Sequence, residues 1–302
     1  MRKVIVRRVR VNRPRPQAVA GPQPGLKLVN TDILRKFDPS LLDLGDINAP
    51  AQEIGAVAAV FDLSGFTSFC NQVDSHLAIP KFLGGFMEWL FSGIRIGLTQ
   101  ESQGGRQSLW AQLPIMVKFL GDGVLLLWNT RGMADIQICK LVAMLYDICY
   151  DYQRRFYPQI SMTLDQPPSV LRCGVARGRV YSIGNGKDFV GHCINTASRL
   201  ANLGMLTFCF HHRGIPAQEY MTDEYYRIFA KTYLPIRGLG EKEMVWVVKE
   251  EFNRLPEASK DLFRSNEVPR AEAQDYNYHG GVKAKPTFVK ARDVQSSFTV
   301  KV

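Results

Sequence analysis

Paired cysteines are missing from this sequence: its six cysteines form no CxxC motif, and most of them lie in apolar segments. Neither a disulfide framework nor a zinc site is therefore expected. Long apolar runs are missing too, because none approaches the roughly eighteen residues that cross a membrane. The first residues are charged but lack the hydrophobic core of a signal peptide. We expect a cytoplasmic protein that does not enter a membrane.

Acidic residues are absent from the first sixteen positions, which carry seven lysine and arginine residues. Much of the net charge of +10 therefore belongs to a local arm and not to a basic domain. No aromatic side chains alternate with these cations to stack on bases, so a solvated arm is favoured over a nucleic-acid-binding surface. Residues 4–11 alternate as an edge strand would, and a Pro- and Gly-rich linker follows them.

An ordinary globular composition remains once these classes are set aside. With 302 residues, of which 46% are apolar and 22% charged, the chain can bury one large core. We divide it into a basic arm and linker at residues 1–50, a central domain at residues 51–250 and an extension at residues 251–302. From about residue 252 the extension is polar and weakly periodic, so we expect a tail ordered only by packing.

The central domain begins with its clearest strand. Residues 54–63 form a continuous apolar run, which is typical of a strand buried on both faces. A long amphipathic segment, residues 66–98, predicts one or two helices broken near Pro80. Residues 118–128 predict a hairpin with Gly-Asp-Gly in its turn. A helix is expected from about residue 134 to residue 156.

Strands and helices continue to alternate in the second half. Residues 170–184 predict two strands joined at Arg177 and Gly178, and residues 192–203 predict a helix. The remaining expectations are strands at residues 219–222 and 243–250, and a loop at His211 and His212. This order of elements predicts an α+β fold in the ferredoxin-like style, with an antiparallel-rich sheet and helices packed on one face.

Two aspartates stand at the ends of predicted strands: Asp62 ends the first strand and Asp122 lies at the hairpin tip. Asp-Gly alone is common turn chemistry, so Asp122 by itself indicates only a turn. If the two elements are neighbouring strands, however, the carboxylates converge and repel each other unless hard cations lie between them. Mg²⁺ held by one or two carboxylates and by substrate phosphates is the usual arrangement for polyphosphate chemistry.

Further polar groups accompany these aspartates. The turn after the first strand offers backbone N–H groups and a threonine hydroxyl to an anion. It consists of Ser64, Gly65, Phe66 and Thr67. Asn195 and Arg199 stand four apart on a predicted helix, so they face one side. Arginine can neutralise charge on phosphorus and asparagine can fix a ribose. A surface pair is the commoner explanation for this spacing alone.

The segments FDLSGFT, KFLGDG and KDFVGHCINTASR, in this order, resemble the class III nucleotide cyclases, the adenylate and guanylate cyclase family. The resemblance covers about residues 54–249, and three ordered motifs are far more specific than one. It implies conversion of a nucleoside triphosphate to a 3′,5′-cyclic monophosphate and pyrophosphate, without a side-chain nucleophile. It also implies a head-to-tail homodimer with two equivalent sites between the subunits.

The resemblance assigns roles to particular residues. Two divalent metal ions, Mn²⁺ or Mg²⁺, are expected at Asp62, Leu63 and Asp122. Lys118 and Asp188 are expected to read the base. Asn195 is expected to orient the ribose, and Arg199 to stabilise the transition state. One departure concerns the triphosphate. Where the family often has KGKG, this chain has RGLGEK, with Leu239 at the position of the second lysine; Arg237 or Lys242 would substitute.

The base has two interpretations. Lys118 with Asp188 is the pair that the family associates with adenine, which favours cyclic AMP. One donor and one acceptor do not separate adenine from uracil or cytosine, however. A lone cyclase domain containing LPIMVKFLGDGVLLLW resembles the bacterial pyrimidine cyclases of antiphage Pycsar systems. We therefore favour conversion of UTP to cUMP, with conversion of CTP to cCMP as the second choice. A separate effector protein is expected to bind the product.

Alternatives from other classes stay open. A stand-alone adenylate cyclase is the first. An inactive cyclase-fold module that binds a nucleotide or a partner is the second, and the leucine at position 239 favours it. The presence of both aspartates and of Asn195 and Arg199 argues against such a module. Nucleic-acid binding through the basic arm is the weakest alternative.

Overall fold

The structure is a computed structural model that describes residues 30–36, 38–103, 106–264 and 298–299. The chain divides into two compact units, Met1–Asp43 and Leu44–Val302. The described part of the first unit holds a short helix, α1 (Thr31–Arg35), and a 3₁₀ turn, η1 (Pro39–Leu42). The edge strand predicted at residues 4–11 and the linker after it lie outside the described residues.

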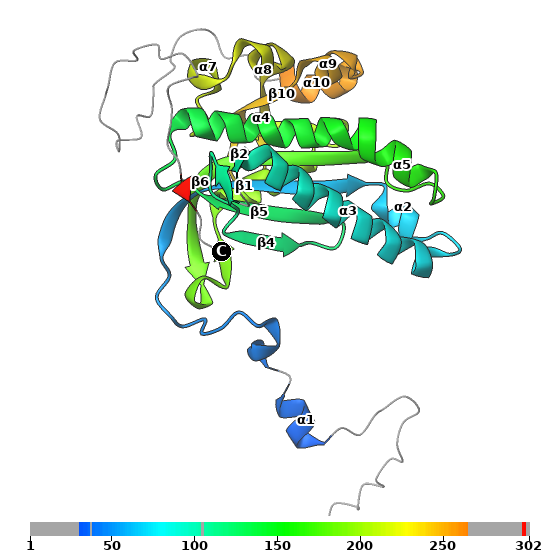
Figure 1. Ribbon diagram of the computed structural model, residues 1–302, viewed down its shortest axis with the longest axis vertical. Coiled ribbons are helices and arrows are strands. Elements are labelled where there is room, and N and C mark those ends of the chain that lie inside the picture. Colours follow the sequence, from blue (N-terminus) through cyan, green and yellow to red (C-terminus); the bar gives the residue numbers. More distant parts are fainter. Residues whose placement is uncertain (1–29, 37, 104–105, 265–297, 300–302) are drawn as a thin grey trace, which may run out of the picture. The chain divides into compact units, whose positions relative to one another are not determined.

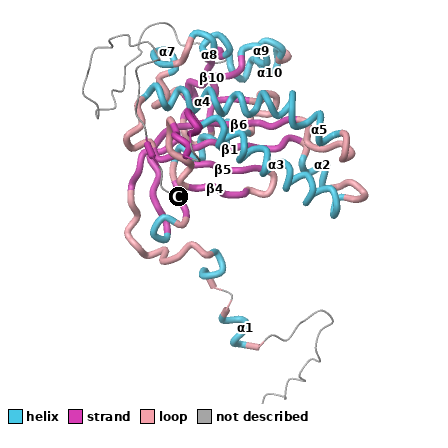
Figure 2. The backbone as a smooth tube through the Cα atoms, in the orientation of Figure 1, coloured by secondary structure: helices cyan, strands magenta, loops and turns pink. Residues whose placement is uncertain are grey.

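The second unit is built on a mostly antiparallel sheet, which Figures 1 and 2 show as a row of side-by-side strands. Across the sheet the strands are β4 (Met116–Phe119), β5 (Gly123–Asn129), β1 (Glu53–Ser64), β6 (Val170–Ile183), β8 (Phe208–His211), β10 (Gly240–Val248) and β9 (Phe229–Ile236). β6 and β8 pair in parallel, and the other neighbours pair antiparallel. A short strand, β7 (Asp188–Val190), pairs with the end of β6 after the turn η3 (Gly184–Gly186).

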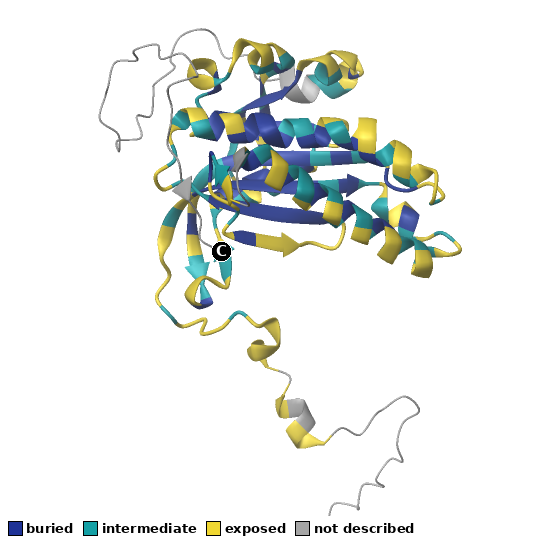
Figure 3. Cartoon of the chain, in the orientation of Figure 1, coloured by how far each residue is buried: buried dark blue, intermediate teal, exposed yellow. Residues whose placement is uncertain are grey.

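β1 is the central strand, and its apolar run is buried on both faces (Figure 3). Val57 and Phe61 belong to one core cluster, whereas Ala56 and Ala58 belong to another. Successive side chains of a strand point to opposite faces, so an unbroken apolar run suits a strand covered on both sides. The strand predicted at residues 54–63 is confirmed.

Helices cover the two faces of this sheet. α3 (Ser75–Leu98) and α4 (Asp135–Asp151) pack against the cluster that contains Phe61, and α6 (His192–Ala201) packs Ala197 against the opposite cluster. The α+β fold with an antiparallel-rich sheet is therefore confirmed, and α6 adds a helix on the second face. Among the described residues, no helix has both the length and the apolar character to span a membrane.

The shorter helices complete the second unit. They are α2 (Phe66–Cys70), a π-helical turn (Tyr152–Phe156), α5 (Tyr157–Ser161), α7 (Ala217–Tyr220), α8 (Asp223–Ile228), α9 (Lys249–Arg254) and α10 (Glu257–Arg264). A second small sheet, missed by the sequence pattern, joins β2 (Thr99–Gln103), β3 (Arg106–Leu109) and β11 (Phe298–Thr299). The predicted helix at residues 134–156 is confirmed by α4 and the π-helical turn that continues it.

The helix break near Pro80 is wrong in its position. Pro80 lies inside α3, and the break falls at residues 71–74, between α2 and α3. Pro80 is the sixth residue of α3, so the helix lacks there the one hydrogen bond that a backbone N–H would give to the carbonyl oxygen of His76. Phe82, Phe86 and Leu90 are spaced one turn apart along α3, and their buried side chains keep the helix packed on the sheet.

The turn predicted at Arg177 and Gly178 is also wrong, because β6 runs unbroken through both residues. Its partner β1 pairs with it over the whole length, with Ala56 opposite Gly178. A Cβ on Gly178 would lie 3.1 Å from the Cβ of Cys193 in α6. The glycine therefore serves a close approach between strand and helix, which a sequence pattern cannot distinguish from a turn.

Three smaller predictions need correction. The strand expected at residues 219–222 is the end of helix α7, whereas the strand at residues 243–250 is confirmed by β10. His211 is not a loop residue: it ends β8 and is buried, with Nε2 3.0 Å from a carboxylate oxygen of Glu243. The tail expected from residue 252 begins with the helices α9 and α10, and residues 265–297 and 300–302 lie outside the described part of the chain.

Candidate active site

Asp62 and Asp122 are brought together by strand pairing. Asp62 lies near the end of β1, opposite Gly123, the first residue of β5. Asp122 is the residue before it, in the turn that joins β4 to β5, and its carbonyl oxygen accepts a hydrogen bond of 2.9 Å from the N–H of Leu63. The register of two neighbouring strands thus places two acidic residues side by side.

The glycines around Asp122 are required by this arrangement. Gly121 has a φ of 98°, a conformation that other residues rarely adopt. A Cβ on Gly123 would lie only 2.1 Å from the carbonyl oxygen of Phe61 in β1. Gly-Asp-Gly therefore allows the hairpin tip to turn sharply and to press against β1, so that Asp122 approaches Asp62.

The charge of Asp62 is costly where it lies. Burial, together with the neighbouring charge of Asp122, raises the pKa of Asp62, and the guanidinium of Arg172 opposes this rise. Arg172 is opposite Asp62 in β6, and its Nε lies 3.2 Å from Oδ2 of Asp62. Two like charges beside each other, with one arginine as a counter-charge, form a site that a divalent cation would stabilise.

Sequence reasoning missed Arg172. Its side chain is only 16% exposed, and its Nη1 also donates to the carbonyl oxygen of Gly204 at 3.3 Å. The available signal was a single arginine in the otherwise apolar start of a strand, VLRCGV. A buried charge of this kind requires a partner, but the sequence did not identify Asp62 as that partner.

The donors at this site fit Mg²⁺ or Mn²⁺ better than zinc. Among the described residues, no group of three or more His, Cys, Asp or Glu side chains is close enough to hold a metal ion. Mg²⁺ characteristically uses one or two carboxylates and takes its other ligands from water and phosphate. Asp62 and Asp122, with the backbone of Leu63 next in the chain after Asp62 and hydrogen-bonded to Asp122, are compatible with that coordination.

In the turn after β1, backbone N–H groups are placed to bind an anion, whereas one of the side chains belongs to the core. Ser64 ends β1, and Gly65, with a φ of 86°, precedes α2. The ring of Phe66 packs against the rings of Phe69 and Phe82, so this side chain belongs to the core. Among the described residues, no acceptor bonds to the backbone N–H groups of Phe66 and Thr67.

Lys118 and Asp188 form an ion pair although they are far apart in sequence. Lys118 lies in β4, Asp188 begins β7, and Nζ lies 2.5 Å from Oδ2. The other carboxylate oxygen of Asp188 accepts a hydrogen bond of 2.8 Å from the N–H of Phe189. The lysine is half exposed and the aspartate is 14% exposed, so the pair presents one donor and one acceptor at the protein surface.

Asn195 and Arg199 lie one turn apart on α6, as the spacing predicts. The guanidinium of Arg199 is beside the turn between β9 and β10: a Cβ on Gly238 would lie 3.3 Å from its Nη1. Within the part of the chain that the structure describes, no hydrogen bond or ion pair connects Asp62 or Asp122 to either residue. The aspartate pair and the pair on α6 are thus not bonded to each other among the described residues.

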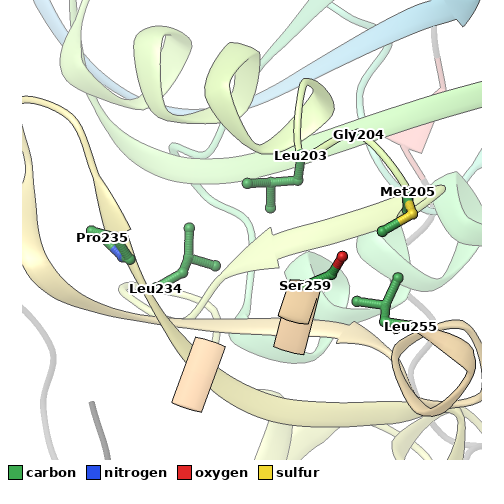
Figure 4. A pocket seen from close by; sticks show the side chains of 7 residues that line it. All are labelled: Leu203, Gly204, Met205, Leu234, Pro235, Leu255 and Ser259. Carbon is green, nitrogen blue, oxygen red and sulfur yellow. The ribbon is translucent and has the colours of Figure 1, made fainter. Parts of the chain in front are cut away.

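Two of the predicted phosphate residues lie at the turn beside Arg199, Arg237 in the turn itself and Lys242 near the start of β10. Both side chains are exposed. Leu239 packs against the apolar cluster formed by α6, β9 and β10, which accounts for a leucine at this position in structural terms. A cavity of about 230 Å³ lies nearby, between the loop after α6, β9 and α10 (Figure 4). Its lining is largely apolar, and it contains none of the predicted site residues.

Comparison with known proteins finds similarity at the level of structure alone. No family model matches the sequence, and no curated protein matches it. A bacterial light-regulated adenylyl cyclase has a similar structure, with a TM-score of 0.47 and 14% identity over 73% of this chain; the chain spans 61% of that protein. The catalytic core of a rhodopsin-guanylyl cyclase of converted specificity, in complex with ATPαS, has a TM-score of 0.46 and 17% identity. That match covers 66% of this chain and 97% of the other. The adenylyl cyclase CyaB from P. aeruginosa has a TM-score of 0.46 and 12% identity, and the match covers 66% of this chain and 95% of CyaB.

Proposed function

We propose that the protein is a nucleotide cyclase that converts a nucleoside triphosphate to a 3′,5′-cyclic monophosphate and pyrophosphate. The observation that carries this proposal is the pair Asp62 and Asp122, which strand register holds together although their charges repel. The order of the three sequence motifs supports the same activity. In the reaction, the ribose 3′-oxygen forms a bond to the α-phosphorus, and the bond from that phosphorus to the pyrophosphate oxygen breaks.

Asp62, Asp122 and the backbone of Leu63 would hold two divalent ions, Mg²⁺ or Mn²⁺. Bound there, such ions lower the pKa of the attacking hydroxyl and neutralise the triphosphate. Arg172 beside Asp62 opposes the rise in the pKa of this carboxyl that burial causes, which favours the charged form that a metal ligand needs. The chain itself contributes charge, position and the exclusion of water rather than a nucleophile.

The remaining residues bind the substrate. Lys118 and Asp188 would contact the base through their donor and acceptor, Asn195 would orient the ribose, and Arg199 would neutralise charge that develops on the α-phosphoryl group. The triphosphate would be received by the turn after β1 and by two exposed cations, one in the β9–β10 turn and one near the start of β10. These are Ser64, Gly65, Phe66, Thr67, Arg237 and Lys242.

The proposed enzyme is a head-to-tail homodimer. The motif resemblance supports a second chain as the source of Asn195 and Arg199, across an interface with two equivalent sites; among the described residues of one chain, no hydrogen bond or ion pair links them to the aspartate pair. An apolar strip on and just before β4 supports such an interface. Ile115, Val117 and Phe119 alternate along the chain and are 40%, 42% and 51% exposed.

For the base we propose a pyrimidine, with UTP giving cUMP preferred over CTP giving cCMP. The support is the motif likeness to antiphage pyrimidine cyclases, in which case the cyclic product acts on a separate effector in the bacterial cytoplasm. Production of cAMP from ATP is the alternative, and the Lys118–Asp188 pair supports it equally well.

One incubation tests these proposals together. The purified protein is mixed with ATP, GTP, CTP and UTP in the presence of Mn²⁺ or Mg²⁺, and every cyclic product is identified by mass. A cyclic pyrimidine nucleotide is the expected product. cAMP alone would support the cyclase and reject the pyrimidine assignment. The absence of any cyclic product, with nucleotide binding intact, would favour the non-catalytic module.

A further inference from the structure

The segment Leu44–Gln52 leads into β1 and runs beside the β6–β7 hairpin (Figure 2). We call this segment the strap. At one end, the carbonyl oxygen of Leu44 presses against Gly184 so closely that a Cβ on this glycine would lie 1.3 Å from it. Gly45, with a φ of 71°, lies against the same turn, since its own Cβ would be 3.0 Å from the carbonyl oxygen of Gly184.

Hydrogen bonds fix the other end of the strap. The N–H of Gln52 donates to Oγ of Ser182 at 2.9 Å, and the N–H of Ser182 donates to the carbonyl oxygen of Gln52 at 3.0 Å. The strap therefore contacts the hairpin at two places, at the turn between β6 and β7 and at Ser182 in β6. Both contacts involve backbone atoms and short side chains, so they leave little freedom of position.

The same hairpin carries the carboxylate of Asp188. Asp188 is the first residue of β7 and pairs with Ile183, the residue before Gly184. A two-stranded hairpin is marginally stable by itself, and its position relative to the sheet depends on the segments that pack against it. A shift at the turn would move Asp188 away from Lys118 in β4, where the ion pair is now made.

We propose that the strap is a positioning element that sets the place of Asp188 and thereby the choice of base. The inference rests on the proposed function, because it takes the Lys118–Asp188 pair as the group that contacts the base. Leu44 and Ser182 contact no substrate themselves; they act through Asp188. Loosening the strap should change which nucleotide is preferred while leaving Asp62 and Asp122 at the far end of β1 in place.

Two glycines of the hairpin turn provide a matched test. Gly184 and Gly186 both have positive φ, 57° and 90°, so an alanine strains the backbone at either position. The variants differ in contact: a Cβ on Gly184 meets the strap, whereas a Cβ on Gly186 meets nothing within 4 Å. Gly184→Ala should lower kcat/KM for the preferred nucleotide about tenfold or more and reduce its preference over the others. Gly186→Ala should keep the wild-type preference.

A second variant guards against loss of folding. Ser182→Ala removes one hydroxyl from the strap contact without backbone strain, and it should shift nucleotide preference in the same direction by a smaller factor. Amide hydrogen exchange should show faster exchange at Ser182 and Gln52 in Gly184→Ala and unchanged exchange in Gly186→Ala. Equal preference and equal exchange in the two glycine variants would overturn the proposal.

Binding separates this proposal from the proposed activity. 3′-Deoxynucleoside triphosphates lack the attacking hydroxyl, so their affinities can be measured without turnover. If the wild-type protein forms no cyclic nucleotide, the proposed function fails. The strap proposal still predicts that Gly184→Ala, and not Gly186→Ala, changes the ratio of affinities for 3′-deoxy-UTP and 3′-deoxy-ATP. An unchanged ratio would reject it whatever the catalytic result.

Discussion

The two charged pairs of this protein are held together by different forces. Asp62 and Asp122 have the same charge, and the pairing of β1 with β5 keeps them close despite their repulsion. Lys118 and Asp188 have opposite charges and attract each other across elements that are not adjacent in sequence. Burial and repulsion raise the pKa of Asp62, so the first pair destabilises the protein that contains it.

This difference teaches how much each pair indicates about function. An ion pair between partly exposed side chains forms readily and contributes little to stability, so Lys118 with Asp188 could occur in a protein of any activity. A pair of carboxylates that the backbone brings together is destabilising, and the single guanidinium of Arg172 offsets only part of its charge, so a divalent cation would stabilise it. The aspartate pair is therefore the stronger evidence, and substitutions in the two pairs should have effects of different size.

The largest effect is expected from removing one of the like charges. Asp122→Asn or Asp62→Asn should lower turnover at least about 100-fold, because the metal ligands are lost at the centre of the reaction. Thermal stability should stay at or above the wild-type value for Asp122→Asn, since a repulsion is removed. Steady-state kinetics and a melting curve measure both. Asp74→Asn, in an exposed turn before α3, is the control for loss of an acidic residue, and full activity of Asp122→Asn would refute the site.

Arg199→Ala tests a charge that belongs to neither pair. Its guanidinium should contact the substrate most strongly as charge develops, so kcat should fall about 100-fold and KM should change much less. Arg199→Lys should recover part of the loss, because the charge remains while the planar donor fork is absent. A rise in KM with unchanged kcat would show that the residue binds the ground state instead.

A smaller effect is expected from the opposite-charge pair. Lys118→Gln or Asp188→Asn should lower kcat/KM about tenfold and alter the order of preference among the four nucleotides. The free energy of unfolding should change by about 1 kcal/mol or less, because the lysine is half exposed. Competition between nucleotides and urea denaturation measure the two quantities. Unchanged preference in both variants would remove these residues from the base site.

Much of the fold can be predicted from local patterns, and so can the aspartate site. The continuous apolar run of β1 and the Gly-Asp-Gly turn are both readable in the sequence, and together they place Asp62 near Asp122. The features that could not be read depend on distant partners. Gly178 resembles a turn residue until Cys193 of α6 is seen against it, and Arg172 resembles a surface cation until Asp62 is found opposite it.

The smallest effect concerns the pH dependence of stability. Because the pKa of Asp62 is raised in the folded state, by burial and by Asp122, the stability associated with its protonated form is fully present below the unfolded pKa and is lost as pH rises through the folded value. Asp62→Asn should therefore gain stability relative to the wild-type protein between acidic and neutral pH. Denaturation across this range measures the difference. A gain toward acidic pH would show that the carboxyl is stabilised, and not destabilised, by its surroundings.

The central claim is that the backbone holds Asp62 and Asp122 together in order to bind a divalent cation. Calorimetric titration of Mn²⁺ into the wild-type protein, with a 3′-deoxynucleoside triphosphate present, tests it most directly. Binding of Mn²⁺ to the wild-type protein, with most of that binding lost in Asp122→Asn and retained in Asp74→Asn, is the predicted result. Equal binding of Mn²⁺ by the wild-type protein and Asp122→Asn would contradict the claim.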